Sequence, residues 1–124
     1  TLPSVEMIGV RAFRRVPKVH RVYISSKNLT TIKKGAFREC TGMTKFNVVS
    51  TKLNSLQKYA LYGNSKLKTI IFKSEHLTKS NVGSKTFSGI KSTATFTVPA
   101  GSVQNYKDLF KSKGAGSKFK VKSL

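Results

Sequence analysis

The side chains that could carry out chemistry are few in this 124-residue chain, and they do not gather in the sequence. Cys40 is the one cysteine, and the two histidines, His20 and His76, are far apart. The carboxylates number four: Glu6, Glu39, Glu75 and Asp108. Catalysis by paired carboxylates, and a metal site with three or four ligands, both need more such groups close together. The sequence therefore predicts no enzyme, no metal and no cofactor.

One spacing known from nucleophilic catalysis does occur, a serine three residues before a lysine. It is found at Ser55/Lys58, Ser65/Lys68, Ser88/Lys91 and Ser117/Lys120. In a chain this rich in Ser and Lys about two such pairs arise by chance, and none stands beside the other motifs of the penicillin-recognising enzymes. We interpret these pairs as coincidental, and we expect Cys40 to be a buried core residue rather than a nucleophile.

The charge balance is extreme, with 24 Lys and Arg against four acidic residues and a net charge of +20. A domain this basic attracts polyanions such as nucleic acid, anionic lipid surfaces, anionic glycans and cell-wall polymers. Lys far outnumbers Arg, and no motif that reads or stacks bases stands beside the charge. Nonspecific polyanion binding therefore stays open as an alternative function. No apolar stretch approaches the roughly 20 residues of a membrane span.

The elements that must position any functional residue repeat every 24 residues. Equal segments open at Val5, Leu29, Leu53 and Leu77, and a second apolar position recurs at Phe13, Phe37, Leu61 and, after two extra residues, Phe87. A period of this size indicates stacked supersecondary units that bury their faces against one another. We expect repeats over about 5–28, 29–52, 53–76 and 77–100, and a C-terminal cap over 101–124. The N-terminus shows no comparable cap, so we expect the natural chain to continue upstream.

Each repeat contains two apolar residues separated by one position, which is the period of a strand. These pairs are Val22 and Ile24, Phe46 and Val48, Ile70 and Phe72, and Phe96 and Val98. We predict strands over 20–26, 44–50, 68–74 and 94–98 that form a parallel sheet. On the other side of each repeat, we predict a single helical or 3₁₀ turn, as at Ala36–Cys40. Asn64 shares the slot of Cys40 and is expected to hydrogen-bond to loop backbone.

The predicted cap begins at Ser102, a suitable N-cap residue for a helix that runs to Lys113. Its apolar residues Val103, Tyr106, Leu109 and Phe110 fall at helical spacing and would close the last repeat. After the glycines at 114 and 116, residues 119–121 are predicted to return as a short strand.

The strand residues that alternate with the core positions must point to the opposite face of the sheet. This outer face mixes basic, aromatic, amide and apolar side chains, a composition that suits binding of another macromolecule. The alternative is a solvated face without a partner. The candidate binding residues are Arg21, Tyr23, Lys45, Asn47, Val49, Thr69, Ile71 and Lys73.

The second repeat, Leu29-Thr-Thr-Ile32, then Gly35-Ala-Phe-Arg-Glu-Cys40, Met43 and Phe46-Asn-Val48, resembles the BspA-like leucine-rich repeats of bacterial surface proteins. The ending Val98-Pro99-Ala100-Gly101-Ser102 resembles the C-terminal closure of that family. The chain departs from the pattern where Tyr59 replaces the glycine, where Asn64 and Ile90 replace the cysteine, and at an insertion around 80–82.

The resemblance implies an α/β solenoid, a right-handed leucine-rich-repeat stack of about four units with a short parallel sheet on one face. It also implies a secreted or cell-surface protein that binds a protein or glycan on a host or bacterial surface, although this chain contains no signal peptide. We therefore expect a non-enzymatic binding and adhesion module. A polyanion-binding domain and a purely structural spacer are the alternatives, and the sequence assigns no oligomeric state.

Overall fold

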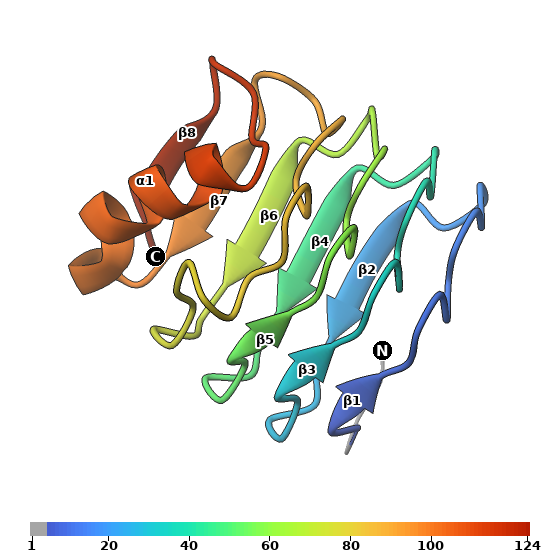
Figure 1. Ribbon diagram of the computed structural model, residues 1–124, viewed down its shortest axis with the longest axis horizontal. Coiled ribbons are helices and arrows are strands. Elements are labelled where there is room, and N and C mark those ends of the chain that lie inside the picture. Colours follow the sequence, from blue (N-terminus) through green and yellow to red (C-terminus); the bar gives the residue numbers. More distant parts are fainter. Residues whose placement is uncertain (1–4) are drawn as a thin grey trace.

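Five strands lie side by side in one parallel sheet in the computed structural model, which describes residues 5–124 (Figure 1). Thr1–Ser4, where the sequence predicts no cap, lie outside the described residues. The strand order is β2-β4-β6-β7-β8. The first four strands confirm the predicted positions, slightly shortened: β2 (Arg21–Ile24), β4 (Lys45–Val48), β6 (Thr69–Phe72) and β7 (Thr95–Val98).

The register of this sheet reproduces the spacing of the sequence repeat. Phe46 lies opposite both Val22 and Ile70, which are the residues 24 positions before and after it. Ile70 lies opposite Phe96, so the two extra residues of the fourth repeat do not disturb the pairing. The side chains of Phe46, Ile70 and Phe96 are fully buried, whereas Val22 in the edge strand is half-buried. The predicted core positions of the strands are therefore confirmed.

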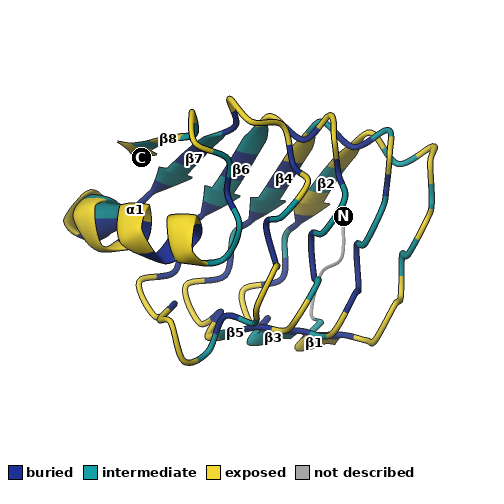
Figure 2. Cartoon of the chain, turned by 45° about the horizontal axis from the view of Figure 1, so that its top comes forward, coloured by how far each residue is buried: buried dark blue, intermediate teal, exposed yellow. Residues whose placement is uncertain are grey.

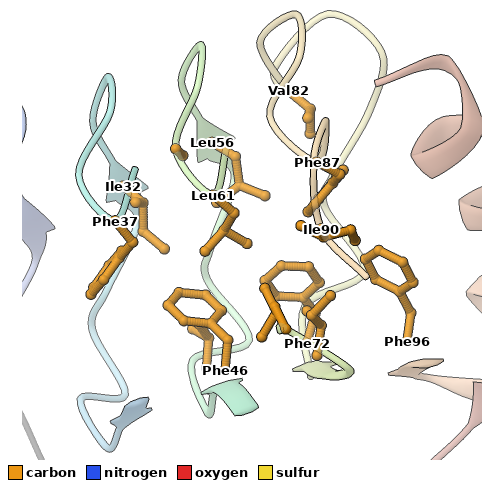
Figure 3. Packing of buried hydrophobic residues seen from close by; sticks show 14 of the residues in the cluster. Ile32, Phe37, Phe46, Leu56, Leu61, Phe72, Val82, Phe87, Ile90 and Phe96 are labelled. Carbon is orange, nitrogen blue, oxygen red and sulfur yellow. The ribbon is translucent and has the colours of Figure 1, made fainter. Parts of the chain in front are cut away.

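Aromatic side chains pack against one another both within a coil and between neighbouring coils. The ring centroids of Phe37 and Phe46 are 5.0 Å apart, those of Phe46 and Phe72 are 6.3 Å apart, and those of Phe87 and Phe96 are 5.2 Å apart. Figure 3 shows these side chains pointing into the same interior space from the sheet and from the opposite loops. Such contacts contribute beyond the area they bury, so the core resists sliding of one coil along another.

A second parallel sheet, which the sequence did not predict, lies beside the first (Figure 1). It consists of the two-residue strands β1 (Met7–Ile8), β3 (Thr31–Ile32) and β5 (Ser55–Leu56). In the sequence, Ile8, Ile32 and Leu56 recur at 24-residue spacing as apolar positions, but two residues are too few to display a strand period. In the fourth repeat, the insertion leaves a single bridge between Leu56 and Val82.

The prediction of a helical or 3₁₀ turn at Ala36–Cys40 is wrong. The segment forms two successive β-turns, closed by hydrogen bonds from Ala36 N to Lys33 O (3.1 Å) and from Arg38 N to Gly35 O (3.1 Å). Gly35 and Glu39 have φ angles of +64° and +57°, which a right-handed helix does not allow. The physical reason is hydrogen bonding to the next coil. The amide of Phe37, which lies between those of Ala36 and Arg38, donates to Ala60 O (2.9 Å) instead of to a carbonyl group of its own turn.

The C-terminal cap confirms the prediction in type and place. A 3₁₀ turn η1 (Ala100–Ser102) leads into α1 (Val103–Ser112), with Ser102 at the N-cap, although its side chain makes no capping hydrogen bond. The helix covers the last coil and buries Tyr106, Leu109 and Phe110. β8 (Lys120–Ser123) then pairs with β7 and becomes the edge strand of the larger sheet.

Tyr106 joins the cap to the coil beneath it. Its hydroxyl group is buried, donates to Ser74 O (2.6 Å) and accepts from Leu77 N (3.2 Å). Ser74 itself belongs to a buried series at 24-residue spacing, in which Ser50 Oγ donates to Leu29 O (2.7 Å) and Ser26 Oγ to Val5 O. One phenol therefore satisfies a backbone acceptor and a backbone donor that would otherwise be buried without partners.

We expect the substitution Tyr106→Phe to lower the free energy of unfolding by about 1–3 kcal/mol, because both backbone groups lose their partner without access to water. Denaturant unfolding followed by circular dichroism measures this change. The matched control is Tyr23→Phe, whose hydroxyl lies on an exposed side chain and should change stability by about 0.5 kcal/mol or less. Equal effects of the two substitutions would contradict this assignment.

Candidate binding face

The outer face of the larger sheet brings the eight candidate residues together. Six come from two rows of paired strand residues: Arg21, Lys45 and Thr69 form one row, and Tyr23, Asn47 and Ile71 form the next. Paired strands in a sheet lie about 4.8 Å apart, so the residues of each row are direct neighbours. The remaining two, Val49 and Lys73, directly follow β4 and β6.

The candidate residues differ in how far they reach into solvent. Tyr23 is 47% exposed, and Arg21, Lys45 and Lys73 are exposed as well. The middle of the face, formed by Asn47 and Ile71 with Thr69 and Val49, is half-buried (Figure 2). Long, exposed cationic side chains thus surround a less exposed centre of apolar and amide groups.

Asn47 lies at the centre of this face and has an unused acceptor. Its Oδ1 atom is covered by neighbouring atoms and has no hydrogen-bond partner among the described residues. None of the four carboxylates of the chain belongs to the two rows of the face. The face can therefore offer cationic groups, a phenol and apolar contact, a combination that suits recognition and provides no acid–base pair.

β8 extends the face further than the sequence predicted. Lys120 pairs with Thr95 and Lys122 pairs with Thr97, so both lysines continue the two rows beyond β7. The sequence predicted a strand here but did not place it in the sheet. The alternation Lys120-Val121-Lys122 was the available signal, since Val121 packs against the core while the lysines point away from it.

A groove with a volume of about 710 Å³ lies between α1 and β8. Its charged lining comes from Lys107, Asp108 and Lys111 of the helix and from Lys120 and Lys122 of the strand. Four lysines against one carboxylate make the groove cationic. This arrangement suits attraction of anionic polymers in general and selects no particular one.

The Cys40 thiol is a structural group. The side chain is fully buried, and its Sγ atom donates to Phe13 O (2.9 Å). Asn64 occupies the equivalent place one coil later and donates to Phe37 O (2.9 Å) and Leu61 O (2.7 Å), which confirms the predicted backbone hydrogen bond. Burial raises the pKa of Cys40, which disfavours the reactive thiolate.

The histidines do not come together with other ligating groups. His20 Nδ1 lies 3.1 Å from the carbonyl oxygen of Gly42, and His76 is an exposed loop residue. Within residues 5–124, His, Cys, Asp and Glu form no group of three that could hold a metal ion. Over the same residues, no helix combines the length and the apolarity that crossing a membrane requires.

Comparison with known proteins identifies one family. A family model described as a BspA type leucine rich repeat region matches residues 1–119 in six copies. The match spans the repeats, α1 and the start of the returning C-terminal segment. Comparison with curated proteins and with solved structures gives no match for this chain.

The burial of Cys40 predicts slow modification by Ellman's reagent. At about pH 8 we expect the native chain to react about 100-fold more slowly than the chain unfolded in guanidinium chloride, because the thiol must first be exposed by opening of the fold. The variant Cys40→Ala/Thr51→Cys, which places the thiol at an exposed loop position, is the control and should react as fast as the unfolded chain. Fast modification of native Cys40 would contradict the core assignment.

Proposed function

We propose that this chain, which belongs to the BspA-type leucine-rich-repeat family, is a non-enzymatic binding module whose outer sheet face contacts a protein or glycan ligand. Repeats of this family generally form protein-binding surface modules, and leucine-rich repeats are typically non-catalytic. In this proposal the chain is a right-handed solenoid of about four repeats over 5–28, 29–52, 53–76 and 77–100. The cap over 101–124 closes it.

The observation that carries the proposal is the row formed by Tyr23, Asn47 and Ile71 on three adjacent strands. A phenol, an amide with an unpaired acceptor and an apolar side chain lie side by side on a backbone held by hydrogen bonds on both sides of β4. Rigid aromatic groups lose little entropy on binding, and partly desolvated centres of this kind contribute most of the affinity at interfaces. The surrounding cations Arg21, Lys45 and Lys73 would steer a ligand of opposite charge.

We base the proposed cellular setting on the family. BspA-type proteins are often surface proteins, and we extend this to a secreted or surface-attached bacterial protein that functions in adhesion. The ligand class in this proposal is a macromolecule of a host or bacterial surface. The sheet that carries this face has five strands side by side, and an open sheet face suits an extended ligand better than a small molecule, which binds in concave sites.

Binding of polyanions through charge alone is the second candidate, and the net charge of +20 together with the groove between α1 and β8 favours it. Its signature is a steep loss of affinity as salt rises, with no preference among anions. Binding to nucleic acid through charge would show this signature. A structural spacer that is held to anionic wall polymer by its basic surface would behave in the same way. Salt dependence therefore separates these alternatives from recognition by the sheet face.

The test uses a panel of immobilised extracellular-matrix proteins and neutral glycans, measured by biolayer interferometry at about 150 mM NaCl. We expect at least one probe to be retained, and the variant Tyr23→Ala/Ile71→Ala to bind it about tenfold or more weakly. Asn105→Ala/Lys107→Ala, at exposed positions of α1, is the matched control and should bind as the unchanged protein does. Unchanged binding by the sheet-face variant would refute the proposal.

A further inference from the structure

Four of the five arginines of the chain gather on the turn side, away from the candidate binding face. Arg14 and Arg38 occupy the same place in successive coils, and Tyr62 occupies it in the third. Backbone hydrogen bonds hold these turns together, from Arg15 N to Arg38 O (2.9 Å) and from Glu39 N to Tyr62 O (2.7 Å). We call the group formed by Arg11, Arg14, Arg15, Arg38, Tyr59 and Tyr62 the arginine patch.

The charges of the arginine patch are not balanced within the protein. Glu39 is the carboxylate beside it, and its Oε1 atom lies 3.2 Å from Arg38 Nε and 3.5 Å from Arg15 Nε. One carboxylate thus serves two guanidinium groups, and the contact with Arg38 does not have hydrogen-bond geometry. Within residues 5–124, Arg11 and Arg14 form no ion pair. Four guanidinium groups against one carboxylate leave three positive charges in excess.

Arg38 is held ready for a ligand rather than free in solvent. Its guanidinium carbon lies 4.6 Å from the ring centroid of Tyr59 and 4.8 Å from that of Tyr62, and the two rings meet edge to face at 5.2 Å. The side chain is 30% exposed. Cation–π contacts with two rings restrict the position of the guanidinium group, so less side-chain freedom remains to be lost on binding an anion.

Arg14 lies in an unfavourable place for a cation. Its Nε atom is buried and has no hydrogen-bond partner in the described protein. Burial together with the neighbouring charges of Arg15, Arg11 and Arg38 lowers the pKa of Arg14. Arg11 and Arg38 both lie close to Gly35, since a Cβ atom added to this glycine would lie 3.5 Å from Arg11 Cγ and 3.9 Å from Arg38 Cβ. A bound anion would supply the missing acceptor and relieve the repulsion among these groups.

We infer that the arginine patch is a binding site for a phosphate or sulfate monoester group carried by a larger ligand. Such a group presents three free oxygens in a tetrahedral arrangement, and guanidinium groups that approach from several sides can each donate to one or two of them. A phosphate monoester carries about two negative charges, which matches the excess of the patch better than the single charge of a carboxylate. A sulfate monoester also carries one charge, and it differs from a carboxylate by its third acceptor oxygen. This site is separate from the outer sheet face.

Isothermal titration calorimetry at about 150 mM NaCl tests the inference with three probes. Inositol hexakisphosphate carries phosphate monoesters, sucrose octasulfate carries sulfate monoesters, and benzenehexacarboxylate carries carboxylates only. We expect one or both esters to bind about tenfold or more tightly than the carboxylate, and the better ester identifies the source of the group. Absence of ester binding, or equal binding of the carboxylate, would overturn the inference.

The variant Arg14→Lys/Arg38→Lys retains the net charge and removes the planar donor geometry. We expect it to weaken binding of the preferred ester about tenfold, with Arg14→Lys alone as the milder variant if the double variant unfolds. Lys79→Gln/Lys118→Gln removes two exposed charges from the fourth repeat and the cap, at the opposite end of the stack from β2, and should weaken binding less than about threefold (Figure 1). If the Lys→Gln variant weakened binding more than this, net charge alone would account for the binding and the inference would be wrong.

The sheet-face variant Tyr23→Ala/Ile71→Ala separates this inference from the proposed function. We expect it to bind the preferred ester as the unchanged protein does, because its two substitutions lie on the outer face of β2 and β6. A loss of ester binding in this variant would place the anion site on the sheet face and overturn the assignment to the arginine patch.

Discussion

Backbone hydrogen bonds between coils are the constraint on which the rest of this structure depends. No coil can satisfy its own backbone amides and carbonyls. Its strands, two or four residues long, pair with strands of the neighbouring coils, and every second amide of its turns donates to a carbonyl group of the next coil. Phe37 N bonds to Ala60 O, and Thr44 N bonds to His20 O, so each coil finds its hydrogen-bond partners in the neighbouring coils. An unpaired buried backbone group is costly, and a shift of one residue in the strand register would move the buried side chains of a strand to the outer face. The side-chain series at Ser26, Ser50 and Ser74 strengthens the same register.

The same constraint decides where function can reside. The interior is filled by the core, and burial raises the pKa of Cys40, the one thiol it contains, so the working parts must be surface rows set by the register. On the sheet side this places Tyr23, Asn47 and Ile71 next to one another, and on the turn side it places Arg14 beside Arg38. The two surfaces belong to opposite sides of the same coils and differ in chemistry, with a mixed apolar and cationic face on one side and paired guanidinium and phenol groups on the other. In these two proposals, one module would bind two different ligands on separate surfaces.

The sequence predicted the features that its period displays. The strand pairs such as Phe46 and Val48, the cap helix from Ser102 and the buried role of Cys40 all follow from apolar residues at fixed spacing, because burial of apolar side chains drives folding most strongly and recurs in every coil. The turns could not be predicted in this way. One turn position has positive φ in all four repeats, and glycine occupies it only in the second, at Gly35. The other repeats have Arg11, Tyr59 and Lys85 there, since hydrogen bonds to the adjacent coil outweigh the steric cost of αL for those side chains. The arginine patch was missed for a related reason, because its members lie up to 51 positions apart, from Arg11 to Tyr62, and meet only when the coils are stacked.

Native-state hydrogen exchange measured residue by residue by NMR tests the stacking most directly. Strands bonded on both sides should open only with global unfolding, so the amides of Phe46, Val48, Ile70 and Phe72 are expected to exchange last. The edge strand β2, with a partner on one side, should exchange sooner, and exposed loop amides such as that of Lys66 should exchange first. Exchange of the four central amides as fast as that of Lys66 would contradict the account, because it would show that successive coils are not joined in one continuous ladder.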